Sequence, residues 1–174
     1  ASRVAGGAVA KAILDKMGID VIAYTIESNG IKLDKPVTYE MAKANYRKNE
    51  INCPDLKLAE VMRDDVLRIK ELGETAGGVV ECIVKGAPAG LGEPVFDKLN
   101  AMLAHGICSI GAIKGLEFGA GFEVARLLGS KCNDSAYVDP ETGKVRFKTN
   151  NAGGILGGIS TWEEIRMRCA VKPT

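Results

Sequence analysis

Apolar residues recur at helical spacing in several stretches of the chain, and residues that start or stop helices bound these stretches. The clearest apolar stripe, over residues 56–72, is followed by Gly73, a common helix stop. The first stretch, over residues 2–17, ends before Gly18. A short polar stretch begins at Thr38, a residue type that caps helix N-termini. These patterns predict helices over residues 2–17, 38–45, 56–72, 95–106 and 119–128.

Runs rich in β-branched residues lie between the helical stretches. They predict strands over residues 19–27, 75–84, 107–118 and 165–171. A turn signal over residues 139–144 predicts a hairpin that pairs residues 137–138 with residues 145–147. Because a hairpin argues against a purely parallel sheet, we predict an α+β fold with layered helices and antiparallel β-sheets. The sequence contains no repeat or linker, so we expect residues 1–174 to form a single domain.

Composition is that of a globular protein with no strong electrostatic preference. Apolar residues make up 46% of the chain and the net charge is +1, which predicts neither nucleic acid nor an anionic membrane as a partner. No apolar run approaches the roughly 20 residues that a membrane span needs. The five cysteines include no Cys-x-x-Cys pair. Their spacing predicts reduced thiols in a cytoplasmic protein, with no disulfide framework and no zinc site.

Residues 149–160, which we call the glycine loop, contain the densest glycine motif. Gly153–Gly154 and Gly157–Gly158 flank two large apolar residues, and Asn150 and Asn151 precede them. Glycine lets a ligand approach the backbone closely, and asparagine amides can both donate and accept hydrogen bonds. One interpretation is a loop shaped around a planar or phosphorylated ligand, with Ile155, Leu156 and Ile159 anchoring it in the core. The other is a turn between strands.

Other candidate chemistry is weaker. The single histidine, His105, has no carboxylate partner at helical spacing, and we interpret it as a structural or surface residue. Gly119-Ala120-Gly121 lacks the third glycine of a dinucleotide-binding fingerprint, because position 124 is Val. Asp64 and Asp65 are adjacent on a predicted helix, so their side chains diverge. The residues by themselves predict no catalytic group and no metal site.

Four co-linear blocks of the sequence resemble the chorismate synthase family. They are Arg3–Ala8, Gly77–Glu81 with Pro88–Leu99, Ser109–Phe122, and the glycine loop followed by Lys172-Pro173-Thr174. The blocks extend over nearly the whole chain but not over the whole family enzyme. The chain therefore resembles an internal or C-terminal-half fragment. The resemblance implies helices packed between or against antiparallel sheets, a β-α-β sandwich within a larger homotetramer.

The resemblance also implies an activity and a cofactor. Chorismate synthases are lyases that eliminate phosphate from 5-enolpyruvylshikimate 3-phosphate to give chorismate, and they use reduced FMN without net redox change. The positions that match the family's flavin contacts are Gly111, Ala112, Gly157, Lys172, Pro173 and Thr174. We expect no catalytic residue in this chain, because the resemblance places the family's catalytic histidines upstream of Ala1. It places the family's arginine-rich loops just before Ala1 and beyond Thr174. The alternatives are a non-catalytic core or oligomerisation fragment, and an unrelated flavin-binding domain.

Overall fold

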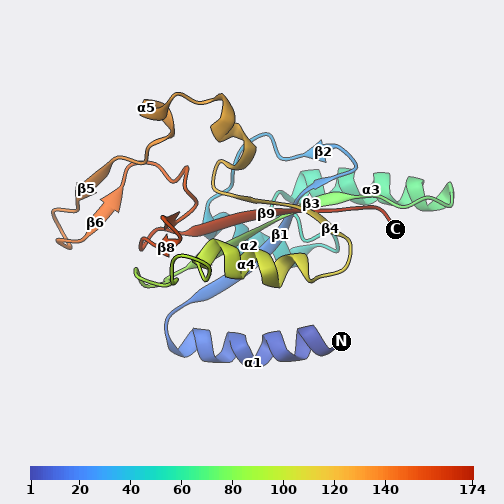
Figure 1. The fold of residues 1–174 in the computed structure, drawn as a ribbon. Coiled ribbons are helices and arrows are strands. Elements are labelled where there is room, and N and C mark those ends of the chain that lie inside the picture. Colours follow the sequence, from blue (N-terminus) through green and yellow to red (C-terminus); the bar gives the residue numbers. More distant parts are fainter. The chain divides into compact units, whose positions relative to one another are not determined.

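The computed structural model describes all 174 residues, and Figure 1 shows the course of the chain. Its α-helices are α1 (Ser2–Lys16), α2 (Tyr39–Asn45), α3 (Leu56–Glu71), α4 (Leu99–Cys108) and α5 (Gly129–Cys132). Short 3-10 helices form at η1 (Tyr46–Lys48) and η2 (Gly121–Arg126). The helices predicted over residues 2–17, 38–45 and 56–72 are confirmed. No helix is both long enough and apolar enough to span a bilayer.

The strands form one larger sheet and two small ones. The large sheet contains β1 (Asp20–Ser28), β2 (Ile31–Lys32), β3 (Gly78–Lys85), β4 (Ile113–Phe118) and β9 (Ile165–Val171), in the order β2-β1-β3-β9-β4. The small sheets pair β5 (Ala136–Val138) with β6 (Val145–Phe147), and β7 (Ile155–Leu156) with β8 (Ile159–Ser160); both pairs are antiparallel. The predicted α+β fold with helices and antiparallel sheets is confirmed.

The chain divides into two compact units. The first unit comprises Ala1–Val21, Ile83–Leu103 and Glu117–Arg166. The second comprises Ile22–Cys82, Ala104–Leu116 and Met167–Thr174. The boundaries fall inside elements β1, β3, α4, β4 and β9.

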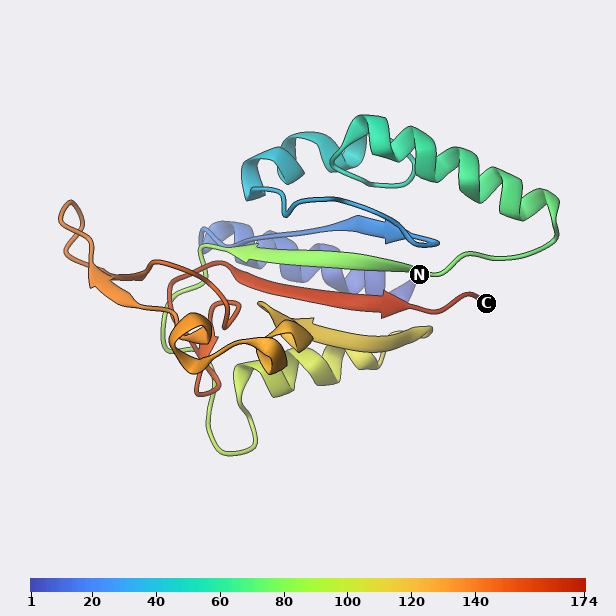
Figure 2. The same ribbon diagram turned by 90° about the horizontal axis from the view of Figure 1, so that it is seen from above.

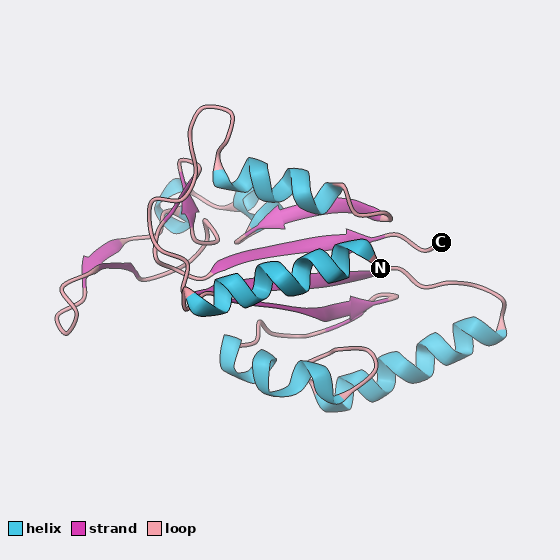
Figure 3. Cartoon of the chain, turned by 90° about the horizontal axis from the view of Figure 1, so that it is seen from below, coloured by secondary structure: helices cyan, strands magenta, loops and turns pink.

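In the second unit, the stretches of β1, β3, β9 and β4 run in alternating directions, and helices α2 and α3 lie beside the β2 edge of the sheet (Figures 2 and 3). Met62 and Ala59 on α3 are buried with Cys53, and Ile31 and Leu33 pack against this cluster. The apolar stripe of α3 therefore holds the helix against the segment that follows β1, as its periodicity predicts.

Local signals explain where the elements of the second unit begin and end. The Thr38 hydroxyl accepts a hydrogen bond from the Met41 N–H at 3.2 Å, which confirms it as the N-cap of α2. The Asp55 carboxylate caps α3 through the Lys57 and Leu58 N–H groups. The turn between β1 and β2 places Asn29 at φ 49° and Gly30 at φ 81°, the left-handed pair that a two-residue hairpin requires.

In the first unit, helix α1 has no buried residue. The side chains of Val4, Val9 and Ile13 are 77%, 66% and 57% exposed. The helix was predicted correctly, but this chain leaves most of its apolar surface exposed. The β5–β6 hairpin is also as predicted, with Tyr137 opposite Arg146. Arg146 in turn donates to Glu163 at 2.6 Å and 3.0 Å, a bidentate pair that ties the hairpin to the segment before β9.

Two predicted elements around residue 100 are wrong in their bounds. Helix α4 begins at Leu99 and not at residue 95, because the Glu93 N–H donates to the Asp97 carbonyl at 2.8 Å and closes a turn there. Val95 and Phe96 are consequently 72% and 88% exposed. The same helix continues to Cys108, so the strand predicted over residues 107–118 is confined to Ile113–Phe118.

The helix predicted over residues 119–128 is also wrong. Gly119 and Gly121 adopt φ 55° and φ 58°, left-handed conformations that an α-helix cannot contain. The chain forms only the 3-10 helix η2, and the Glu117 carboxylate accepts the Phe122 N–H at 3.3 Å. The next helix, α5, begins at Gly129.

Candidate functional site

Five of the six predicted cofactor-binding residues lie together in the second unit. Gly111 and Ala112 precede β4, and the Lys172-Pro173-Thr174 segment follows β9, the neighbouring strand. The Lys172 N–H donates to the Ala112 carbonyl at 2.9 Å. We call residues 111–112 and 172–174 the β4–β9 junction. Antiparallel pairing thus places the end of one strand beside the start of another that is about sixty residues away in sequence.

The backbone of the β4–β9 junction is unusual at Ala112. This residue has φ 70°, a left-handed conformation that costs an L-residue about 1–2 kcal/mol. Gly111 beside it is exposed, and a Cβ added there would meet no atom within 4 Å. Strained conformations persist where the surrounding structure imposes them, and they are frequent at ligand sites. The backbone at Gly111 is therefore open to a ligand, and the conformation of Ala112 is of a kind that is frequent at ligand sites.

The Lys172-Pro173-Thr174 segment is held from the other side by the residues that lead into β3. The Thr75 hydroxyl donates to the Thr174 carbonyl at 2.6 Å and accepts the Thr174 N–H at 3.1 Å. At Gly77 an added Cβ would lie 2.9 Å from the Val171 carbonyl oxygen and 3.0 Å from Pro173 Cδ. Gly77 is therefore needed for close approach of these two segments.

The charge at the β4–β9 junction comes from Lys172. Its side chain is exposed, and its Nζ donates to the Pro173 carbonyl at 3.0 Å. An ammonium carries three donors, so this contact leaves it able to meet an anion at the surface. Together with the Thr174 hydroxyl, it gives the β4–β9 junction the kind of groups that bind a phosphate.

The sixth predicted residue, Gly157, lies in the first unit, in the turn of the β7–β8 hairpin. It is exposed, has φ 61°, and a Cβ added there would meet no atom within 4 Å. Gly157 is the member of the doubled glycines that leaves room for a ligand.

The other doubled glycines are explained by packing within the chain. A Cβ on Gly153 would lie 2.9 Å from the Arg166 carbonyl oxygen and would collide with the Gly119 N–H. A Cβ on Gly154 would lie 2.7 Å from the Glu164 carbonyl oxygen, and one on Gly158 would overlap the Lys98 side chain. The interpretation that both glycine pairs admit a ligand is therefore wrong for these residues.

The polar residues of the glycine loop are also used internally. Asn150 donates to the Glu164 carbonyl at 2.8 Å and accepts the Gly154 N–H at 2.7 Å. The Asn151 side chain donates to the carbonyls of Lys131 and Cys132. Both asparagines therefore fix the loop, as turn-forming asparagines commonly do.

Asp134 anchors the start of the glycine loop. Its carboxylate accepts hydrogen bonds from the Thr149 hydroxyl at 2.5 Å, the Asn151 N–H at 2.8 Å and the Ala152 N–H at 2.8 Å. Burial favours the neutral acid, but the hydrogen bonds outweigh it and lower the pKa of Asp134. Sequence reasoning missed this residue, because its three partners lie more than ten residues away.

The apolar anchors of the glycine loop are fewer than expected. Ile155 is buried, whereas Leu156 and Ile159 are 43% and 37% exposed. Ser160 supplies the second anchor. It is buried, its hydroxyl donates to the Pro88 carbonyl at 2.6 Å, and it accepts the Leu91 N–H at 2.9 Å.

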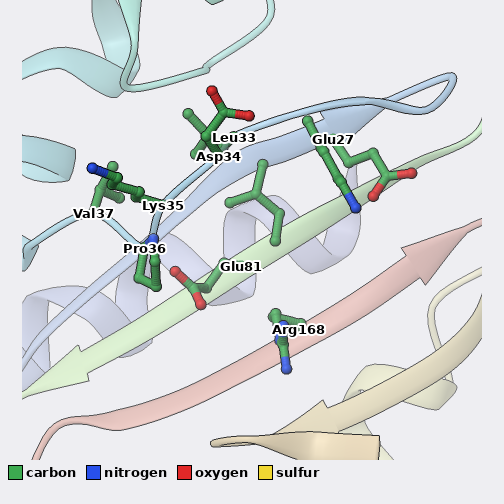
Figure 4. Close-up of a pocket in the computed structure, with 10 residues that line it drawn as sticks. Glu27, Leu33, Asp34, Lys35, Pro36, Val37, Glu81 and Arg168 are labelled. Carbon is green, nitrogen blue, oxygen red and sulfur yellow. The ribbon is translucent and has the colours of Figure 1, made fainter. Parts of the chain in front are cut away.

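The second unit also contains a hollow that the sequence did not indicate. Its volume is about 420 Å³, and it opens between strands β1, β3 and β9 and the segment after β2 (Figure 4). Six ionisable side chains line it: Glu27, Asp34, Glu81, Lys32, Lys35 and Arg168. We call it the ionic hollow. Alternation along a strand places such residues on one face, but only the strand order shows which of them meet.

The other ionisable residues considered from the sequence, His105, Asp64 and Asp65, do not form a catalytic pair. His105 is exposed on α4. Asp65 accepts hydrogen bonds from Arg68 and Asn29, which lower its pKa, while the neighbouring Asp64 binds Arg63. No group of three or more His, Cys, Asp or Glu side chains is arranged to hold a metal ion.

Comparison with known proteins gives a consistent result over the whole chain. The family model described as chorismate synthase matches residues 1–174. A chorismate synthase of Acetivibrio thermocellus is 67% identical over 174 residues, which are 100% of this chain and 44% of that protein. One from Methanosarcina acetivorans is 49% identical over 172 residues, 99% of this chain and 46% of that protein.

A crystal structure of a chorismate synthase agrees with these sequence matches. Its TM-score with this chain is 0.92 at 31% sequence identity, and the match covers 98% of this chain and 54% of the other. The chain spans less than half the length of the curated relatives that it matches.

Proposed function

The chain belongs to the chorismate synthase family, and on that premise we propose that it forms part of the flavin site of a chorismate synthase. The reaction is the conversion of 5-enolpyruvylshikimate 3-phosphate to chorismate, in which the substrate loses phosphate and the C6 proton. The observation that carries the proposal is the β4–β9 junction, which brings together five positions that match the family's flavin contacts.

The residues of the β4–β9 junction fit a phosphorylated planar cofactor. Gly111 leaves open space beside the exposed turn, and the left-handed Ala112 fixes the direction of its peptide groups. Lys172 and Thr174 would hold the cofactor phosphate through an ammonium and a hydroxyl, and Pro173 stiffens the segment between them. Gly157, in the first unit, also matches a family flavin contact and has an exposed backbone, and we propose a cofactor contact for it on that ground alone. Reduced FMN supplies electron density to the substrate ring when it is bound.

The chain offers little for the substrate itself. Stabilising a departing phosphate requires preorganised cations or hydrogen-bond donors, and at the β4–β9 junction the only cation is Lys172. We infer that the reacting groups come from parts of the family protein that this chain does not contain, in a cytoplasmic homotetramer. The chain mixed with reduced FMN and substrate is expected to form no chorismate. Steady formation of chorismate by the purified chain would contradict this inference.

The flavin site can be tested by titrating FMN into the chain and following the quenching of flavin fluorescence. We expect the variant Lys172→Gln to bind FMN about tenfold more weakly, since it loses a charge-assisted contact with the phosphate. Lys114→Gln is a matched control, because Lys114 is an exposed lysine on β4 outside the β4–β9 junction. Equal binding by the two variants would refute the assignment of the phosphate to Lys172.

A second candidate function is that of a non-catalytic core or oligomerisation fragment. The exposed apolar residues of α1 favour it, because they are surface that another chain segment or subunit could cover. Absence of FMN binding together with self-association of the chain would support this alternative.

A further inference from the structure

We propose that the ionic hollow binds a free α-amino acid with an apolar side chain. This proposal concerns the face of the second unit between β1, β3 and β9, and it does not depend on flavin binding. The hollow measures about 420 Å³, within the range of about 300–1,000 Å³ that is usual for small-molecule sites.

The charges that line the ionic hollow favour a ligand that is neutral overall but carries both signs. Three carboxylates and three basic groups surround it. A simple anion such as phosphate would meet three carboxylates, and a simple cation would meet three basic groups, so each is repelled as well as attracted. A zwitterion can place each of its charges beside the opposite one.

Two of these charges lie on adjacent strands at the floor of the ionic hollow. Glu81 is on β3 and Arg168 on β9, which neighbour each other in the sheet (Figure 4). The hydroxyl of Tyr24, which is 1% exposed, donates to the Glu81 carboxylate. This contact holds one oxygen of the Glu81 carboxylate. A carboxylate and a guanidinium on adjacent strands can meet the ammonium and the carboxylate of one α-amino acid.

Each group has more hydrogen-bonding positions than a single contact uses. A guanidinium has five N–H donors and a carboxylate about four acceptor positions. A ligand carboxylate can therefore share Arg168, and a ligand ammonium can share Glu81, without breaking the contact with Tyr24. Arginine is the residue best suited to hold a carboxylate, because two of its N–H groups can bind it side by side.

The remaining wall of the ionic hollow is apolar. Ile26 on β1 and Leu33, Pro36 and Val37 from the segment after β2 line it. Val37 is buried and Leu33 is half-buried, so this wall is held in place by the packing of the second unit. An apolar side chain on the ligand would be removed from water against it. This wall selects an apolar amino acid over a small polar one.

The proposal is tested by NMR titration of the isotope-labelled chain with L-leucine, N-acetyl-L-leucine and L-leucinamide. We expect saturable shifts of amides around residues 26–37, 79–83 and 167–170 with L-leucine, and a Kd of about 1 mM for a ligand of so few atoms. The acetylated and amidated compounds each lack one charge and should bind about tenfold more weakly. Absence of saturation at concentrations tenfold above that Kd, or equal binding of all three compounds, would overturn the proposal.

Variants assign the two charges. Arg168→Gln should weaken L-leucine binding about tenfold, but should weaken L-leucinamide by no more than about twofold, because that compound has no carboxylate to lose. Glu81→Gln should likewise weaken L-leucine binding about tenfold. It should weaken N-acetyl-L-leucine by no more than about twofold, because that compound has no ammonium to lose. The control Arg63→Gln removes an exposed guanidinium on α3, outside the ionic hollow, and should bind L-leucine like the unmodified chain.

Two further measurements keep the result interpretable. If Arg168→Gln does not fold, judged by circular dichroism, Arg168→Lys retains the charge without the paired N–H groups and should give an intermediate loss. Sedimentation tests whether a second copy of the chain covers the ionic hollow. A dimer that Arg168→Gln converts to a monomer would identify the hollow as an interface and overturn the ligand proposal.

Discussion

The glycine loop and the β4–β9 junction differ in how well their sequences indicate an open ligand site. The glycine loop is the most noticeable stretch of the sequence, yet Gly153, Gly154 and Gly158 face atoms of the chain itself. The β4–β9 junction is built from inconspicuous residues, yet it is exposed and contains a non-glycine residue in the left-handed region, Ala112. Glycine can mark close packing as readily as ligand contact, and only the neighbours of each position distinguish the two.

The largest expected effect comes from adding one methyl group to the buried part of the glycine loop. Gly153→Ala combines a left-handed φ of 67° with collision against backbone atoms of Gly119, and we expect it to lower the free energy of unfolding by about 3 kcal/mol or more. Gly157→Ala has a similar φ but open surroundings, and should lose only about 1 kcal/mol. Urea unfolding measures both.

Equal losses for the two alanine variants would show that the φ angle alone determines the effect. That outcome would remove the contrast between the packed and the open glycines, and with it the reason to single out Gly157.

The next effect concerns the anchor of the glycine loop. Asp134→Asn replaces a carboxylate that accepts three hydrogen bonds, and we expect a loss of about 2 kcal/mol. The pKa of Asp134 is lowered in the folded chain. Its contribution to stability is therefore complete above the unfolded pKa, and is lost as the pH falls through the folded pKa. The difference between the two chains should be constant at neutral pH and shrink below about pH 4.

Asp139→Asn is the matched control for this pH dependence. The Asp139 carboxylate also has a lowered pKa, mainly from the Glu141 N–H in the hairpin turn, but asparagine can make the same turn. Its effect on unfolding should be smaller than that of Asp134→Asn. A pH-independent difference between the unmodified chain and Asp134→Asn would contradict the ionised role of Asp134.

On the side of the β4–β9 junction, a larger side chain should block ligand approach without harming the fold. Gly111→Val adds bulk where a Cβ meets no atom within 4 Å, so we expect the urea midpoint to change little while FMN binding weakens about tenfold. Fluorescence titration and urea unfolding together check this. If FMN binds Gly111→Val as tightly as the unmodified chain, the open space at Gly111 is not where the cofactor lies.

Sequence patterns predicted those features of the fold that depend on neighbours in the chain. The helix over residues 56–72, the cap at Thr38 and the hairpin over residues 137–147 follow from local spacing and turn chemistry. Helix starts that depend on distant contacts could not be predicted. The first helical residue of α4, Leu99, donates its N–H to the Gly158 carbonyl at 2.7 Å, and no local signal near residue 95 reveals that partner.

The candidate sites follow the same rule. The flavin positions were identified by resemblance to a family, but the proximity of Ala112 and Lys172 depends on the order of β9 and β4 in the sheet. The ionic hollow was missed for this reason. Glu81 and Arg168 are 87 positions apart in the sequence, and each alone is an ordinary charged residue in a strand.

The smallest expected effect tests whether the strain at the β4–β9 junction belongs to the chain itself. Replacing Ala112, at φ 70°, with Gly relieves a conformational cost of about 1–2 kcal/mol but increases the freedom of the unfolded chain, at a cost of about 0.5–1 kcal/mol. The net result should be a stabilisation of about 0.5 kcal/mol. Ala120→Gly is the control of opposite sign, because Ala120 has an ordinary φ of −70° and gains no relief. Urea unfolding of both variants measures the difference, and destabilisation by both would show that Ala112 is not strained. The β4–β9 junction would then differ from the glycine loop only in being exposed. Gly157, which is also exposed, would be as good a ligand position as any residue of the β4–β9 junction.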